Sequence, residues 1–137
     1  NRSSDRKIKS LMQQVGISPG PLFKNHDILF GGPVSREQLF LLFKDKHAGG
    51  LNIRYAATVD DLQYIASFHE QLDYVAAIGE CVWTPEQILQ EVQHSNWLVL
   101  PAKQELLFES KCEERVNLFL SELGISVEQI TSDKGWA

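Results

Sequence analysis

Apolar and polar positions follow two different periods along this chain, and together they predict both helices and strands. Apolar residues recur three or four positions apart from Ser4 to Val15, which predicts an amphipathic helix that ends at Gly16. Short apolar runs predict buried strands, and strict alternation predicts a strand with one exposed face. The predicted strands are 26–30, 39–43, 51–55, 74–79 and 97–100, and later helical segments are predicted at 106–108 and 113–123.

Two more helices are predicted from their start signals. Thr58, with Asp61 three residues later, marks the start of a helix with an apolar side. Thr84, Pro85 and Gln87 form a capping-box pattern, because threonine caps, proline fits the first helical position and glutamine stands three residues after the cap. The apolar positions of this second helix, which we expect to face the core, are Ile88, Leu89 and Val92.

Helices and strands intermix without a regular alternation, which favours an α+β fold over a doubly wound α/β fold. The length of 137 residues predicts a single domain, 1–137. The chain starts at Asn1 and enters structured sequence at once, so we expect it to be part of a longer protein. The sequence contains neither a run of roughly 20 apolar residues nor a signal-peptide pattern, which predicts a cytoplasmic protein that does not enter a membrane.

Charge is unevenly distributed along the chain. Residues 1–54 carry nine Lys or Arg and four Asp or Glu, a balance of +5, whereas residues 55–137 carry four and fourteen, a balance of −10. The asymmetry fits either a basic face for an acidic partner or two halves that pair with each other. The net charge of −5 and the lack of a second basic helix argue against direct DNA binding by this chain alone.

Motifs for catalysis or cofactor binding are missing from the sequence. It contains no P-loop, dinucleotide-binding, nucleophile-elbow or zinc-protease pattern, so no catalytic residue and no cofactor is predicted and an enzyme is the less favoured class. The four histidines lack an i, i+4 pair, and neither cysteine has a partner two residues away, so no metal site is predicted. Cys81 and Cys112 are interpreted as free thiols, with redox chemistry as an alternative.

Two stretches could bind a ligand or a partner. The pair Gly31-Gly32 before Pro33 either forms a turn or lets a ligand approach the main chain. Trp83 and Trp97 bracket the helix after Thr84, and they either grip a ligand or attach that helix to the sheet, each with one partner for its indole N–H. The candidate binding residues are Gly31, Gly32, Pro33, Cys81, Trp83 and Asn96.

The chain resembles the bacterial AlgH/YqgE family in the order and spacing of several short motifs. They are Gly31-Gly32-Pro33-Val34, Trp83 to Leu89, Asn96-Trp97-Leu98 with Pro101-Ala102, Leu107-Phe108, Arg115, Leu123-Gly124-Ile125 and Gly135-Trp136-Ala137. The resemblance implies an α+β fold with a bifurcated, partly barrel-like sheet surrounded by helices. The family is mostly uncharacterised, and one member is named as a transcriptional regulator.

The chain departs from the family pattern at several places. Relative to the family, the chain lacks an N-terminal strand-rich segment. Ser3 stands where the family has proline, Trp136 where it has histidine, and Gly79 to Trp83 differ from the family's G-Y-A-G-W.

Three hypotheses about function follow. The first is a regulatory protein that acts through an unidentified protein partner. The second is a small-molecule-binding protein or enzyme with a site near Gly31–Pro33 and Trp83. The third is a cysteine-based redox protein.

Overall fold

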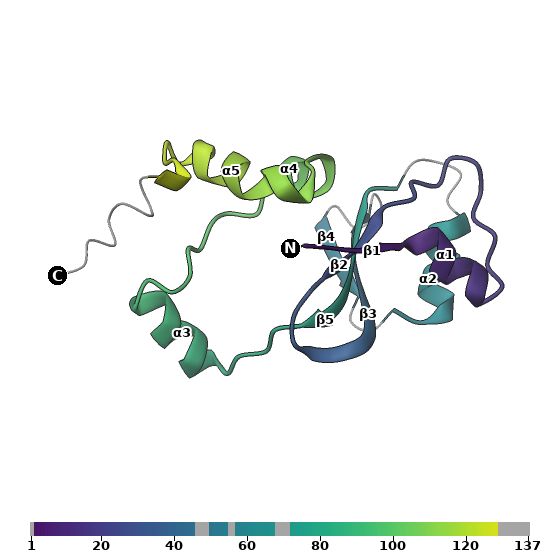
Figure 1. The fold of residues 1–137 in the computed structure, drawn as a ribbon, viewed down its shortest axis with the longest axis horizontal. Helices are drawn as coiled ribbons and strands as arrows, with labels where there is room; N and C mark the ends of the chain where they lie inside the picture. Colours follow the sequence, from purple (N-terminus) through teal and green to yellow (C-terminus); the bar gives the residue numbers. More distant parts are fainter. Residues whose placement is uncertain (1, 46–49, 55–56, 68–71, 129–137) are drawn as a thin grey trace. The chain divides into compact units, whose positions relative to one another are not determined.

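A mixed β-sheet organises the first part of the chain (Figure 1) in a computed structural model that describes residues 2–45, 50–54, 57–67 and 72–128. The strands are β1 (Ser3–Lys7), β2 (Asp27–Phe30), β3 (Val34–Asp45), β4 (Gly50–Arg54) and β5 (Tyr74–Glu80). They lie in the order β1-β2-β5-β3-β4, and only β2 and β5 pair in parallel among them. The sheet is open in the described part of the chain, with β1 and β4 at its edges. The predicted α+β class is confirmed.

The helices belong to two compact units. The helices are α1 (Ile8–Gln14), α2 (Val59–Ser67), α3 (Pro85–Gln93), α4 (Gln104–Glu109) and α5 (Cys112–Glu122). Asn1–Leu98 forms one unit with the sheet and α1 to α3, and Val99–Ala137 forms the other with α4 and α5. Within the second unit, Lys103 pairs with Glu122, and the Arg115 guanidinium donates to the Ser110 carbonyl over 3.2 Å. No helix in the described ranges is long and apolar enough to cross a membrane. That residues 1–137 form one domain stays a prediction.

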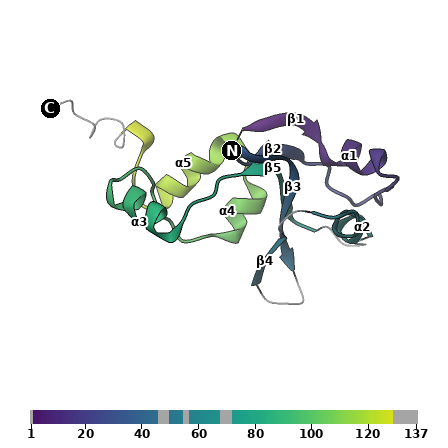
Figure 2. The same ribbon diagram turned by 90° about the horizontal axis from the view of Figure 1, so that it is seen from below.

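The core of the first unit lies between one face of the sheet and the helices α1 and α2. Ile28 on β2 pairs in register with Ala76 on β5, and Ala76 pairs with Leu41 on β3, so all three side chains point to the same face. Figures 1 and 2 show α1 and α2 on the same side of the strands. The buried side chains that the helices add to this core are Ile8 and Met12 from α1, and Leu62, Ile65 and Ala66 from α2.

The first predicted helix is only half correct. Residues 3–7 form strand β1, which pairs antiparallel with β2, and the helix begins at Ile8. Ile8 and Met12 are fully buried, as the helical spacing predicts. None of residues 3–7 is buried, so apolar spacing does not define their structure. Pairing with a strand twenty residues further along the chain satisfies their main-chain groups instead.

The prediction for 84–100 is confirmed at its start and wrong at its end. Thr84 and Gln87 form the predicted capping box at the start of α3. The helix buries none of its residues, however, and Leu89 is 62% exposed although we expected it to face the core. No strand forms at 97–100, where Val99 is 71% exposed. A capping box depends on neighbouring residues, whereas burial depends on a partner surface that the local sequence does not specify.

A buried tyrosine attaches the segment between α1 and β2 to strand β5. The Tyr74 hydroxyl donates to the carbonyl of Lys24, and its ring stacks on Phe23 at 5.6 Å and meets the His26 ring edge-on at 4.9 Å. Burial raises the pKa of Tyr74 well above its ordinary value, so the hydroxyl keeps its proton and remains a donor. Lys24 and Asp73 form an ion pair over 2.6 Å beside this cluster.

We predict that His26 makes the folded state less stable in mild acid. Burial, and next the nearby Lys24 cation, lower the pKa of His26 below its ordinary value of 6.5. The unfolded chain therefore binds a proton more readily than the folded chain. The contribution to stability is complete above about pH 6.5 and is lost as the pH falls from there through the lowered pKa. Urea unfolding at pH 7.5 and 5.5 should show a smaller loss of unfolding free energy for His26→Gln than for the wild type.

The exposed His94 supplies the control. His94→Gln should show the same loss between the two pH values as the wild type. If His26→Gln and His94→Gln behave alike, the assignment of this pH dependence to His26 is wrong.

Candidate ligand-binding site

Strands β2 and β3 are joined by Gly31-Gly32-Pro33, and this connection lies directly against the end of β5. The Gly31 N–H donates to the Ile78 carbonyl over 2.8 Å. A Cβ atom at Gly31 would overlap the carbonyl of Gly79, and one at Gly32 would overlap the carbonyl of Glu80. Gly79 has a φ of +76°, which favours glycine, and a Cβ there would overlap the Gly32 carbonyl. Glycine is required at these three positions because the main chain of the connection is in direct contact with the main chain at the end of β5.

The first residues of β3 bulge away from β5 directly after this contact. Val34 pairs with Glu80 and Leu39 pairs with Ile78, so five steps along β3 correspond to two along β5. Ser35 opens the bulge with a φ of +50°, and its hydroxyl donates to the Glu80 carboxylate over 3.2 Å. Arg36 is therefore carried on the bulge, and its Nε donates to the Pro33 carbonyl over 3.2 Å.

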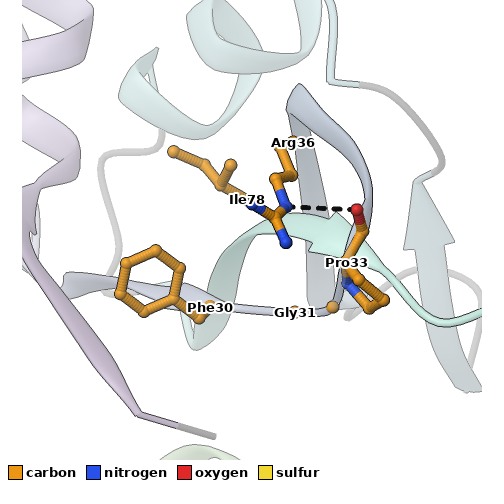
Figure 3. Close-up of a pocket in the computed structure, with 6 residues that line it drawn as sticks. Phe30, Gly31, Pro33, Arg36 and Ile78 are labelled. Carbon is orange, nitrogen blue, oxygen red and sulfur yellow. Dashed lines mark hydrogen bonds between the residues drawn. The ribbon is translucent and has the colours of Figure 1, made fainter.

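A pocket of about 400 Å³ lies between the glycine connection and the bulge (Figure 3). Its volume falls within the roughly 300–1,000 Å³ that is typical of small-molecule sites. Figure 3 shows the Phe30 ring at one side and the Arg36 guanidinium reaching into the space between Phe30 and Pro33. Apolar side chains and the main chain of the two glycines thus lie around one cation, the Arg36 guanidinium. The lining residues are Phe30, Gly31, Gly32, Pro33, Arg36 and Ile78.

Only part of the predicted site lies at this pocket. Gly31, Gly32 and Pro33 line it, so the turn and the candidate site are the same segment. Cys81 is an exposed free thiol whose Sγ lies 3.7 Å from the Gly31 carbonyl oxygen, but it does not line the pocket. The side chain of Cys112 lies outside the described part of the structure. The redox hypothesis therefore stays a prediction.

Trp83 and Asn96 lie in a separate cluster around helix α3. The indole N–H groups of Trp83 and Trp97 both donate to the same Glu91 oxygen, the first over 3.2 Å, and the rings meet edge-on at 5.1 Å. The Asn96 main-chain N–H donates to the Glu91 carbonyl over 2.9 Å. Each indole finds a partner, as predicted. The expectation that the indoles attach α3 to the sheet is wrong, because their partner is on α3 itself.

The pocket residues that the sequence interpretation missed are Phe30, Arg36 and Ile78. Phe30 directly precedes the glycine pair and Arg36 follows Pro33 by three residues, so both were close to the candidate segment. The bulge that positions Arg36 comes from a register shift against β5, and β5 lies about forty residues further along the chain. No pattern in the local sequence indicates such a register shift. Among the described residues, no group of three His, Cys, Asp or Glu could hold a metal ion.

Comparisons with known proteins give a consistent result. The model of the family described as AlgH-like matches residues 1–128. A UPF0301 protein of Legionella pneumophila is 33% identical, and one of Nitrosomonas eutropha is 31% identical; in each case the match covers all of this chain and 77% of the relative. The solution structure of the AlgH protein from Pseudomonas aeruginosa has a TM-score of 0.68 at 25% identity, and the match covers all of this chain and 76% of that one.

We predict that Gly31→Ala destabilises the first unit, whereas Gly20→Ala does not. The added methyl group at Gly31 would overlap the Gly79 carbonyl, so main chain must move, at a cost of about 1–3 kcal/mol in unfolding free energy. Nothing lies within 4 Å of a Cβ at Gly20, so alanine there should leave stability unchanged or raise it by up to about 1 kcal/mol. Equilibrium urea unfolding of both variants measures the difference. Equal stability of the two variants would contradict the close contact at Gly31.

Proposed function

This chain belongs to the AlgH-like family, and we propose that it is a binding protein whose small-molecule site is the pocket beside Gly31. The observation that carries the proposal is the composition of that pocket. The pocket combines an apolar wall, exposed main chain and one cation within a volume suited to a small organic molecule. Ligand pockets of this kind use apolar walls for affinity and a few polar groups for orientation.

The lining residues support binding more than catalysis. General acid–base catalysis needs a group that exchanges protons near neutral pH within hydrogen-bonding reach of the substrate. The lining side chains are apolar or absent except for Arg36, and an arginine guanidinium has only donors and cannot act as a general base. The candidate nucleophile Cys81 contacts the Gly31 carbonyl and does not line the pocket. A site with this lining can select and orient a ligand.

We predict that Phe30→Ala weakens ligand binding without unfolding the protein. Phe30 is 52% exposed, so its removal costs little core packing, but the pocket loses its one aromatic wall. Loss of an aromatic contact should weaken binding roughly 2- to 10-fold. The measurement is an NMR titration of the main-chain amides with four probes: benzyl alcohol, benzylamine, benzoate and phenyl phosphate. In the wild type, at least one probe should shift the signals of Gly31, Gly32 and Arg36.

Leu22→Ala is the matched control, because Leu22 is an exposed apolar residue that does not line the pocket. It should bind the probes as the wild type does. If no probe shifts the pocket amides, or if the shifts spread evenly over the surface, the proposed binding function is wrong.

A regulatory role through a protein partner is the second candidate, and the exposure of α3 and its neighbours favours it. Leu89, Trp97 and Leu98 are 62%, 46% and 54% exposed, and α3 buries none of its residues. Exposed apolar groups that gather on one segment are typical of protein–protein contact surfaces. A transcription-related role of this kind would place the partner on α3 and the small ligand at the Gly31 pocket.

The partner hypothesis predicts that Leu89→Ser abolishes capture of a specific protein. Replacing an exposed leucine by serine removes apolar contact area while leaving the capping box of α3 in place. Affinity capture from the native cytoplasm, read by mass spectrometry, should recover the same protein with the wild type and with Leu22→Ser, and lose it with Leu89→Ser. Recovery of no reproducible protein, or equal recovery with all three baits, would count against the hypothesis.

A further inference from the structure

We propose that the pocket beside Gly31 recognises its ligand by an anionic group, a carboxylate or a phosphate, which binds the Arg36 guanidinium. The inference rests on the proposed binding function and adds the chemical class of the ligand. It also assigns the residue that decides this class. Three features of the described residues carry it: the charge of the lining, the orientation of Arg36 and the pairing of the neighbouring carboxylate.

Arg36 supplies the only charge among the lining residues of the pocket. Its guanidinium carries a positive charge and five N–H donors. One of them, on Nε, donates to the Pro33 carbonyl, which leaves the donors on Nη1 and Nη2 for a ligand. Within the described residues, no carboxylate pairs with Arg36. Two parallel donors on one plane match the two oxygens of a carboxylate or phosphate group.

One hydrogen bond to the main chain restrains this exposed arginine before any ligand binds. The Nε of Arg36 donates to the Pro33 carbonyl. Pro33 belongs to the connection whose glycines are in close contact with the main chain of Gly79 and Glu80. The bulge that carries Arg36 begins at Ser35, and the hydroxyl of Ser35 donates to Glu80. Both interactions connect the segment that carries Arg36 to the end of β5. A positioned side chain loses less conformational freedom on binding, so more of the interaction energy remains as affinity.

The neighbouring acidic residue does not neutralise the site. The Glu80 carboxylate is bound at the start of the bulge, where its Oε1 accepts from the Ser35 hydroxyl over 3.2 Å. Glu80 is absent from the pocket lining. Glu37 follows Arg36 on the bulge, but it is exposed and also absent from the lining. Arg36 is therefore the charged side chain that a ligand in the pocket would contact directly, and its cation attracts an anion and repels a cation.

The rest of the pocket indicates what the anionic group is attached to. Phe30, Ile78 and Pro33 give an apolar wall, and the two glycines leave main chain uncovered beside it. A compact apolar body, such as one ring or a short branched chain, fits the volume of about 400 Å³. Its anionic group would point to Arg36 while the apolar body lies against Phe30. The ligand class is a small organic carboxylate or phosphate monoester.

The test compares probes that share one ring and differ in charge. Benzoate and phenyl phosphate carry the two anionic groups, benzyl alcohol is neutral and benzylamine is a cation. Each is titrated into the full chain, with NMR shifts of the pocket amides as the readout. We expect at least one anion to bind about tenfold or more tightly than benzyl alcohol, and benzylamine to bind most weakly. The ratio of benzoate to phenyl phosphate affinity then distinguishes a carboxylate site from a phosphate site.

Two substitutions of Arg36 separate charge from shape. Arg36→Gln should weaken the preferred anion about tenfold or more and leave benzyl alcohol within about twofold. Arg36→Lys keeps the charge but not the planar fork, so anion affinity should fall between that of the wild type and Arg36→Gln. Arg6→Gln removes one exposed positive charge from β1 and should bind as the wild type does.

The possible results distinguish a failure of the anionic-ligand inference from a failure of the proposed binding function. Benzyl alcohol and benzylamine binding as tightly as the anions would overturn the anionic class and leave the binding function standing. Loss of every probe, including benzyl alcohol, in Arg36→Gln would also overturn the inference, because Arg36 would then only shape the pocket. Failure of all four probes with the wild type would overturn the binding function itself.

Discussion

The contact between two main chains, Gly31-Gly32 on one side and Gly79 to Cys81 on the other, is the constraint on which the first unit depends. The two segments are so close that a single methyl group on any of the three glycines would collide with a carbonyl oxygen. The contact fixes where β2 ends relative to β5. It also fixes where β3 must begin, because Pro33 and Val34 follow without an intervening loop.

The pocket is a consequence of that geometry. Because β3 starts against Glu80 and must later align Leu39 with Ile78, it takes up extra residues in a bulge. The bulge places Arg36 beside the glycine connection, and the main chain of Gly31 and Gly32 lines the pocket together with Arg36. The glycines permit the two main chains to touch, because the main chain of Gly79 and Glu80 fills the space that a Cβ atom would need. Their own main chain also forms part of the pocket lining.

Helix α3 follows a different principle from the sheet, because its stabilising interactions are local. The capping box at Thr84 satisfies the first turn, and the two indoles that bracket the helix donate to Glu91 within it. Hydrogen bonds from its own main-chain N–H and from Thr84 lower the pKa of Glu86 in the first turn, which favours its charged form at the positive end of the helix dipole. None of the apolar residues of α3 is fully buried: Ile88 and Val92 are half-buried, and Leu89 is exposed.

The elements that sequence patterns predicted best are those whose signals are local. The capping box of Thr84 with Gln87 and the strands predicted at 26–30 and 74–79 match the structure. The errors lie where a partner decides the outcome. Residues 3–7 became a strand because β2 was available, and the apolar run at 97–100 did not become one. Of the candidate site residues, Gly31, Gly32 and Pro33 line the pocket, whereas Trp83 and Asn96 lie around α3. That these residues bind a ligand or a partner stays a prediction.

The sequence by itself determined the α+β class, most of the helix starts, the glycine connection and the membership of a family. These depend on side-chain periodicity and on contacts between residues a few positions apart. The tertiary structure alone decided that Arg36 faces Phe30 across a pocket, since this needs a register shift between strands about forty residues apart. It also decided that the two tryptophans share one carboxylate on α3. Contacts between segments that are far apart in the sequence decide such pairing, and the local sequence does not specify it.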